Sequence, residues 1–67
     1  MTFEEFCLKA EASPFHWEIF GEYNDLLFEG HDQQYAMREA LAYGQKLKDE
    51  ALAWAEKQAN ILEGNDQ

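Results

Sequence analysis

β-branched residues are almost absent from this chain, and their absence restricts the fold more than any other feature. The 67 residues include no valine, and the only β-branched residues are Thr2, Ile19 and Ile61. Strands are built mainly from β-branched and aromatic residues, whereas alanine, glutamate, glutamine, leucine and lysine favour helices. We therefore expect an all-α protein in which residues 1–67 form a single helical domain.

Capping signals divide the first half of the chain into two expected helices. The first covers about residues 3–12, after the T-x-x-E capping box that begins at Thr2. The second covers about residues 14–29, because Ser13 is a good N-cap and Pro14 suits the first helical position.

A third and longer helix is expected over about residues 33–63. Gly30 ends the second helix, and Asp32 is placed to cap the third. Gly64 follows the last residue of the apolar pattern and is expected to end the third helix.

The third helix carries a heptad seam in which small and large side chains alternate. Because the heptad continues through Gly44, we expect close helix contact there and not a break, although a mid-helix glycine costs about 1 kcal/mol. The seam is expected either in the domain core or between two copies of the chain. Its positions recur at intervals of three and four residues: Met37, Ala40, Gly44, Leu47, Ala51, Trp54, Gln58 and Ile61.

Helix lengths suggest the packing. We expect the two shorter helices to pack on the long C-terminal helix, the second folding back on its first half and the first covering part of its second half. This arrangement leaves apolar surface on the third helix. A chain this short buries only about 60% of its unfolded surface, so we expect it to dimerise as a homodimer.

The second helix carries an acidic stripe beside an aromatic strip. Like charges four residues apart destabilise a helix slightly, and no lysine or arginine of this helix offsets them. A row of carboxylates can imitate a row of phosphates, and large aromatic side chains often anchor interfaces. Two alternatives are a solvated acidic face and an aromatic strip buried in a dimer. The stripe consists of Glu18, Glu22, Asp25 and Glu29, and the strip contains Trp17 and Phe28.

The acidity is concentrated in the first half of the chain. Residues 1–32 contain eight Asp or Glu and one lysine, and the whole chain has a net charge of −9. Such a field repels nucleic acid and anionic lipid and favours a basic protein partner. No apolar run approaches a membrane span, the N-terminus is acidic, and Cys7 is the only cysteine. We expect a cytoplasmic protein, in the host cytoplasm if it is phage-encoded, with no membrane or direct nucleic-acid contact.

No arrangement of residues indicates catalysis. Cys7 is interpreted as a small buried hydrophobe, Ser13 as a cap, and His16 and His31 as capping or surface residues. No metal-ligand spacing and no phosphate-binding loop occur, so we expect no metal and no cofactor. The chain is expected to be non-enzymatic.

Two functions fit these features. The first is a small acidic binding module, an inhibitor or adaptor that occludes a basic surface of a partner such as a nucleic-acid-binding enzyme. In size, charge and helicity over the whole chain, it resembles the small acidic proteins that phages use against host defence, including anti-CRISPR proteins and DNA mimics. No specific motif carries this resemblance. The resemblance implies inhibition by steric and electrostatic occlusion of the partner's basic surface. The alternative is a homodimeric regulatory or assembly protein, antitoxin-like, whose long helix mediates pairing.

Overall fold

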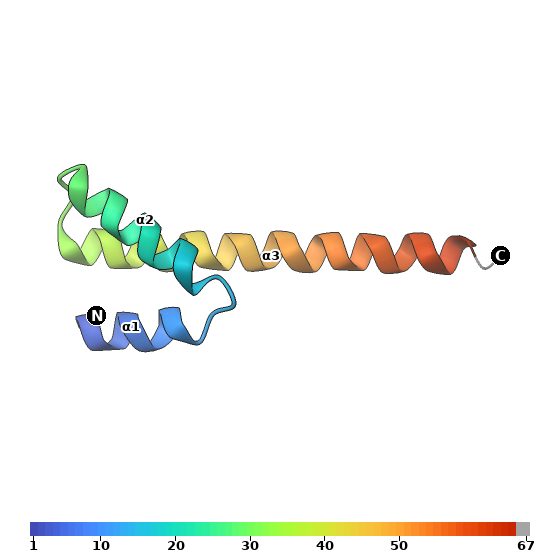
Figure 1. The fold of residues 1–67 in the computed structure, drawn as a ribbon, viewed down its shortest axis with the longest axis horizontal. Coiled ribbons are helices and arrows are strands. Elements are labelled where there is room, and N and C mark those ends of the chain that lie inside the picture. Colours follow the sequence, from blue (N-terminus) through green and yellow to red (C-terminus); the bar gives the residue numbers. More distant parts are fainter. Residues whose placement is uncertain (66–67) are drawn as a thin grey trace.

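A computed structural model describes the backbone of residues 1–65 and the side chains of residues 1–60. Helices α1 (Phe3–Glu11), α2 (His16–Phe28) and α3 (Gln33–Asn65) follow one another. No strand occurs within residues 1–65, and the expected all-α class is confirmed. Both α1 and α2 contact α3, and both lie beside its first half, whereas its second half projects beyond them (Figure 1). We call residues 1–46 the head.

Two helix starts are fixed by side-chain caps that the sequence predicted. Thr2 Oγ1 accepts a hydrogen bond from the backbone N–H of Glu5 at 3.1 Å, before α1. Asp32 Oδ1 accepts from the backbone N–H of Tyr35 at 2.7 Å, at the start of α3. Each cap satisfies a backbone donor that has no partner within the helix.

Gly30 ends α2 through its left-handed backbone conformation, with φ of 100°. Its N–H donates to Leu27 O at 3.0 Å, and the N–H of His31 donates to Leu26 O at 3.1 Å. This pair of hydrogen bonds is a Schellman motif, which requires a residue that tolerates positive φ. The chain can therefore leave α2 and enter α3 within four residues.

Helix α2 begins two residues later and ends one residue earlier than the expected range of about residues 14–29. Ser13 Oγ accepts from the N–H of Phe15 at 3.1 Å, and Ser13 O lies 3.3 Å from His16 Nδ1. Ser13 thus stabilises the turn between the helices, so Pro14 lies in that turn and not in the first helical position. The other two helices differ less from expectation: α1 ends one residue early, and α3 continues through Gly64.

The expected position of α1, over the second half of α3, was also wrong. The Met1 ammonium donates to Gln34 Oε1 at 3.2 Å, and Gln34 Nε2 donates to Met1 O at 2.8 Å. These hydrogen bonds hold the start of α1 at the start of α3. The turn after Glu11 reverses the direction of the chain, so α2 runs back beside α1 and the two helices do not lie end to end (Figure 1).

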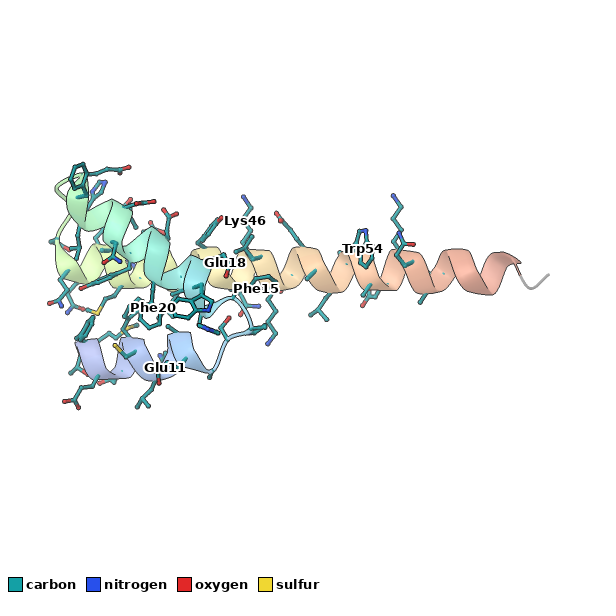
Figure 2. All side chains as sticks on the ribbon, viewed as in Figure 1. Glu11, Phe15, Glu18, Phe20, Lys46 and Trp54 are labelled. Atoms are coloured by element: carbon teal, nitrogen blue, oxygen red, sulfur yellow. The ribbon has the colours of Figure 1, made fainter. Side chains whose placement is uncertain are left out.

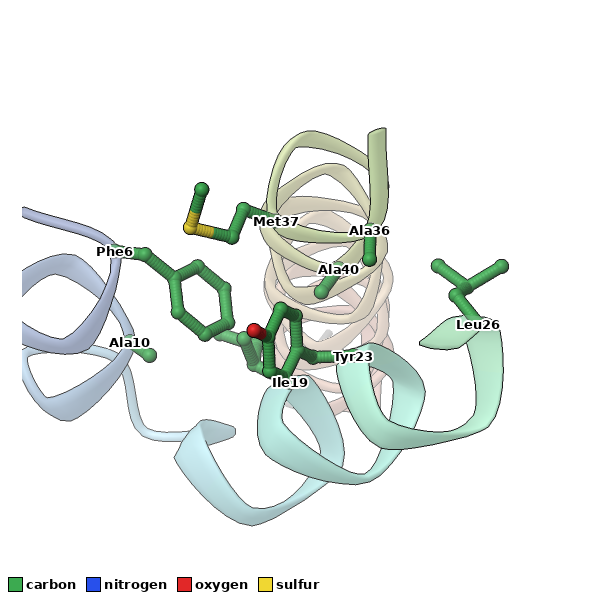
Figure 3. Close-up of a cluster of buried hydrophobic side chains, with 8 residues drawn as sticks. All are labelled: Phe6, Ala10, Ile19, Tyr23, Leu26, Ala36, Met37 and Ala40. Carbon is green, nitrogen blue, oxygen red and sulfur yellow. The ribbon is translucent and has the colours of Figure 1, made fainter. Parts of the chain in front are cut away.

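The core lies where the three helices meet. Phe6 of α1 is fully buried, and its ring centroid lies 4.8 Å from that of Tyr23 and 5.7 Å from that of Phe20. Alanines on the facing side of α3 leave room for these larger side chains. Figure 3 shows the buried cluster: Phe6, Ala10, Ile19, Tyr23, Leu26, Ala36, Met37 and Ala40.

Gly44 marks a close contact between α2 and α3. The helix is continuous through this residue, and a Cβ built on Gly44 would lie 2.5 Å from Ile19 Cγ1. Real Cβ atoms do not approach a neighbour so closely, so only glycine fits here without a shift. The expected close helix contact is confirmed.

The heptad seam is divided between two environments. Its first three positions, Met37, Ala40 and Gly44, are buried in the head. The side chain of Ile61 lies outside the described residues. The packing of α1 and α2 leaves the other positions half-buried or exposed. These positions are Leu47, Ala51, Trp54 and Gln58.

Candidate protein-binding surface

The four carboxylates of the acidic stripe lie along α2 and its C-cap, because their spacing of three or four residues matches the helical turn. Glu18, Asp25 and Glu29 are exposed, and Glu22 is half-buried. Glu29 Oε2 lies 3.6 Å from His31 Nε2, a contact that is an ion pair only when the imidazole is protonated. Among residues 1–60, no lysine or arginine forms an ion pair with any of the four. Their negative field therefore reaches solvent without a cation in contact.

Two large aromatic side chains project from α2 beside the stripe. Trp17 is 76% exposed and Phe28 is 93% exposed. They are eleven positions apart, about three helical turns, so both rings lie on the same side of the helix. The ring of Trp17 lies beside the ring of His16, with 5.0 Å between their centroids. Both rings therefore lie outside the core of the single chain.

Gly21 lies between the two rings, and the fold does not require glycine there. A Cβ built on Gly21 would meet no atom within 4 Å, in contrast with Gly44. A glycine inside a helix costs about 1 kcal/mol relative to alanine. What it provides is bare backbone between Trp17 and Phe28, which another molecule can approach closely. Helical spacing places Gly21 on the same strip as Trp17 and Phe28, but the pattern of charged and aromatic residues gives no signal for its role.

Leu27 is a second residue that sequence reasoning missed. Its helical angle groups it with the buried face of α2, but the side chain is 38% exposed. It lies at the edge of that face, and the direction from which α1 and α3 pack decides whether an edge position is covered. We call the four carboxylates together with Trp17, Gly21 and Phe28 the acidic docking surface.

A separate exposed apolar surface lies on α3, beyond the head. We call residues 47–58 the distal segment. Within it, Leu52 is 54% exposed and Trp54 is 65% exposed. Figure 2 shows Trp54 on the part of α3 that α1 and α2 do not reach. The other residues of the seam in this segment, as described above, are uncovered or only half-covered by the chain itself.

A hollow of about 400 Å³ lies between the end of α1, the following turn and α3, and Lys9 and Lys48 are its charged lining residues. No imidazole, carboxylate or thiol lines it. Cys7 packs half-buried against the core, as a small hydrophobe would. Within the described side chains, no three His, Cys, Asp or Glu residues are grouped to bind a metal ion.

None of the helices, over the residues described, contains an apolar stretch long enough to cross a membrane. No protein-family model, curated protein or solved structure matches this chain.

Proposed function

We propose that this chain is a non-enzymatic binding protein that places its acidic docking surface on a basic surface of a partner protein. One observation supports this proposal above the others. Trp17 and Phe28 are exposed beside carboxylates that, among the side chains of residues 1–60, have no lysine or arginine as an ion-pair partner. An exposed apolar patch bordered by charges is typical of an interaction site. The two features lie on one helix, so a single partner surface can meet both.

The carboxylates and the rings have different tasks in this proposal. Uncompensated charges steer a basic partner and fix its orientation, and their effect on the association rate falls as salt rises. The two rings supply the buried contacts that carry most of an interface's free energy. A partner whose basic groove normally receives phosphates would find that groove occluded. The chain would then act as an inhibitor or adaptor in the cytoplasm, as the phage anti-defence proteins and DNA mimics that it resembles do.

Reversing the charge of the stripe tests this proposal. The test variant carries Glu18→Lys, Glu22→Lys, Asp25→Lys and Glu29→Lys. The control reverses four exposed acids elsewhere, Glu4, Glu5, Glu11 and Glu56, and therefore has the same net charge. Wild type and both variants serve as baits for proteins from the source cells. The partner is the basic protein that wild type and the control retain and the stripe variant does not.

We expect the stripe variant to bind this purified partner about tenfold to 100-fold more weakly than wild type, because each exposed ion pair contributes modestly and four are reversed together. The control should stay within a few-fold of wild type. Calorimetric titration of the partner with each protein measures these affinities, and repeating it at a second salt concentration measures their salt dependence. Equal losses in the two variants would show that net charge alone matters, and the docking surface would then have no support.

The exposure of the distal segment favours a second function. The chain can self-associate through α3 and act as a homodimeric regulatory or assembly protein of antitoxin-like type. The acidic docking surface lies on α2, away from the distal segment, so the two functions are compatible. Sedimentation at micromolar concentration should give a dimer, and a strictly monomeric protein would remove this candidate.

A further inference from the structure

The distal segment is left without a packing partner by the part of the chain that the structure describes. An isolated helix of this length is marginal in water, and Trp54 on this segment is 65% exposed. The seam positions of the segment continue the line of Met37, Ala40 and Gly44, which are buried in the head. A helix packed on the distal segment would therefore extend the existing core.

We propose that a second copy of this chain covers the distal segment, with the two α3 helices antiparallel and the two-fold axis passing between Leu52 and Ala53. This inference rests on the self-association proposed above. It adds the orientation of the two chains and the register of their contact.

The alternation of small and large side chains favours the antiparallel orientation. In heptad terms Gly44 and Ala51 occupy the a positions, whereas Leu47 and Trp54 occupy the d positions. Antiparallel helices place each a position against a d position, so Trp54 packs on Ala51 of the partner subunit. Parallel helices would place Trp54 against Trp54 and Ala51 against Ala51. The layer of two tryptophans would then be crowded, and the layer of two alanines would contain a void. Both defects lower the stability of the dimer.

Charges beside the seam select the register. Glu50 and Lys57 both occupy the g position, next to the seam. With the axis between Leu52 and Ala53, Glu50 faces the partner's Lys57, and two-fold symmetry creates this contact twice. A shift of one heptad in one direction would bring Glu50 against Glu50. A shift in the other direction would bring Lys57 against Lys57.

The charge of the heads agrees with this arrangement. Residues 1–32 hold eight acids and one lysine, and the antiparallel orientation keeps these two acidic regions at opposite ends of the dimer. The contact would use the seam positions that α1 and α2 leave uncovered or half-covered, within residues 47–58. The two acidic docking surfaces would lie about 40 Å apart along the dimer.

Charge exchange at Glu50 and Lys57 tests the register. We expect Glu50→Lys and Lys57→Glu each to raise the dimer dissociation constant about tenfold, because each change turns two attractive contacts into repulsive ones. The double variant should return within about twofold of wild type. Glu56→Lys, an exposed change at a position facing away from the seam, is the control and should have no effect. Sedimentation equilibrium measures all four. Single variants that behave like wild type would overturn the register.

A distance measurement tests the orientation. Nitroxide labels on Arg38→Cys in a Cys7→Ser background should lie about 44 Å apart along the axis of an antiparallel dimer. In a parallel dimer they would lie within about 25 Å, because packed helices are 8–10 Å apart. A dimer with the short distance would overturn the orientation and leave self-association standing. A protein that stays monomeric would overturn both, and the acidic docking surface would be unaffected.

Discussion

Phe6→Ala should lower the free energy of unfolding by about 3–5 kcal/mol, the usual cost of removing a fully buried phenylalanine. Phe6 has no exposed surface and contacts side chains of both other helices. A core in a domain this small rarely supplies more than about 3–5 kcal/mol in total. The variant is therefore expected to be largely unfolded at 25 °C. Far-UV circular dichroism during urea titration measures the loss.

Phe28→Ala is the matched control, because it makes the same chemical change at a side chain that is 93% exposed. Its unfolding free energy should stay within about 0.5 kcal/mol of wild type. Its affinity for the basic partner should nevertheless fall, because Phe28 is one of the two anchors of the acidic docking surface. A large loss of stability in Phe28→Ala would mean that another part of the protein covers this ring, and the docking surface would lose that anchor.

Gly44→Ala should destabilise the protein although alanine favours helices. The gain in helix propensity is about 1 kcal/mol, but the new methyl group would overlap Ile19, whose side chain is itself buried. Overpacking of this kind costs about 1–3 kcal/mol. We therefore expect a net loss of up to about 2 kcal/mol, measured as a lower urea midpoint with an unchanged slope.

Gly21→Ala makes the same change on α2 and should have the opposite sign. Nothing lies within 4 Å of a Cβ at this position, so the full propensity gain of about 1 kcal/mol should appear as increased stability. Binding to the basic partner should weaken, because the methyl group blocks the bare backbone between Trp17 and Phe28. If Gly21→Ala were also destabilising, the fold itself would require glycine at this position. The presence of Gly21 would then be no evidence for a binding partner.

The sequence predicted what depends on local interactions. Thr2 and Asp32 were identified as caps because a cap involves only residues within the next turn. Gly30 was identified as the end of α2 for the same reason. The turn at Ser13 was misjudged, because a serine before a proline suits both a helix start and a tight turn, and here the Ser13 Oγ bonds the N–H of Phe15.

The position of α1 could not be predicted because it depends on contacts between distant residues. The Met1–Gln34 hydrogen bonds and the packing of Phe6 against α3 leave no local signal. The consequence extends to the seam of α3. A continuous heptad pattern does not show how far along α3 the other helices of the same chain cover it. Only the structure shows that Ala40 is buried in the core and that Ala51 is exposed.

The candidate site was predictable in part for the same reason. The spacing of Glu18, Glu22 and Asp25 places them together on any regular helix. Whether Trp17 is exposed depends on which side of α2 faces α1 and α3, and helical periodicity alone left that question open. The partial exposure of Leu27 was not predicted, because this residue lies at the boundary between the covered and uncovered sides of α2.

The two tryptophans allow the central claim, that the acidic docking surface receives the partner, to be tested in one titration. Trp17 lies on that surface and Trp54 on the distal segment, so their indole N–H signals in a ¹⁵N-labelled protein report on the two surfaces separately. Addition of the purified basic partner should shift or broaden the Trp17 signal and leave the Trp54 signal in place. A response of Trp54 with an unchanged Trp17 would contradict the account.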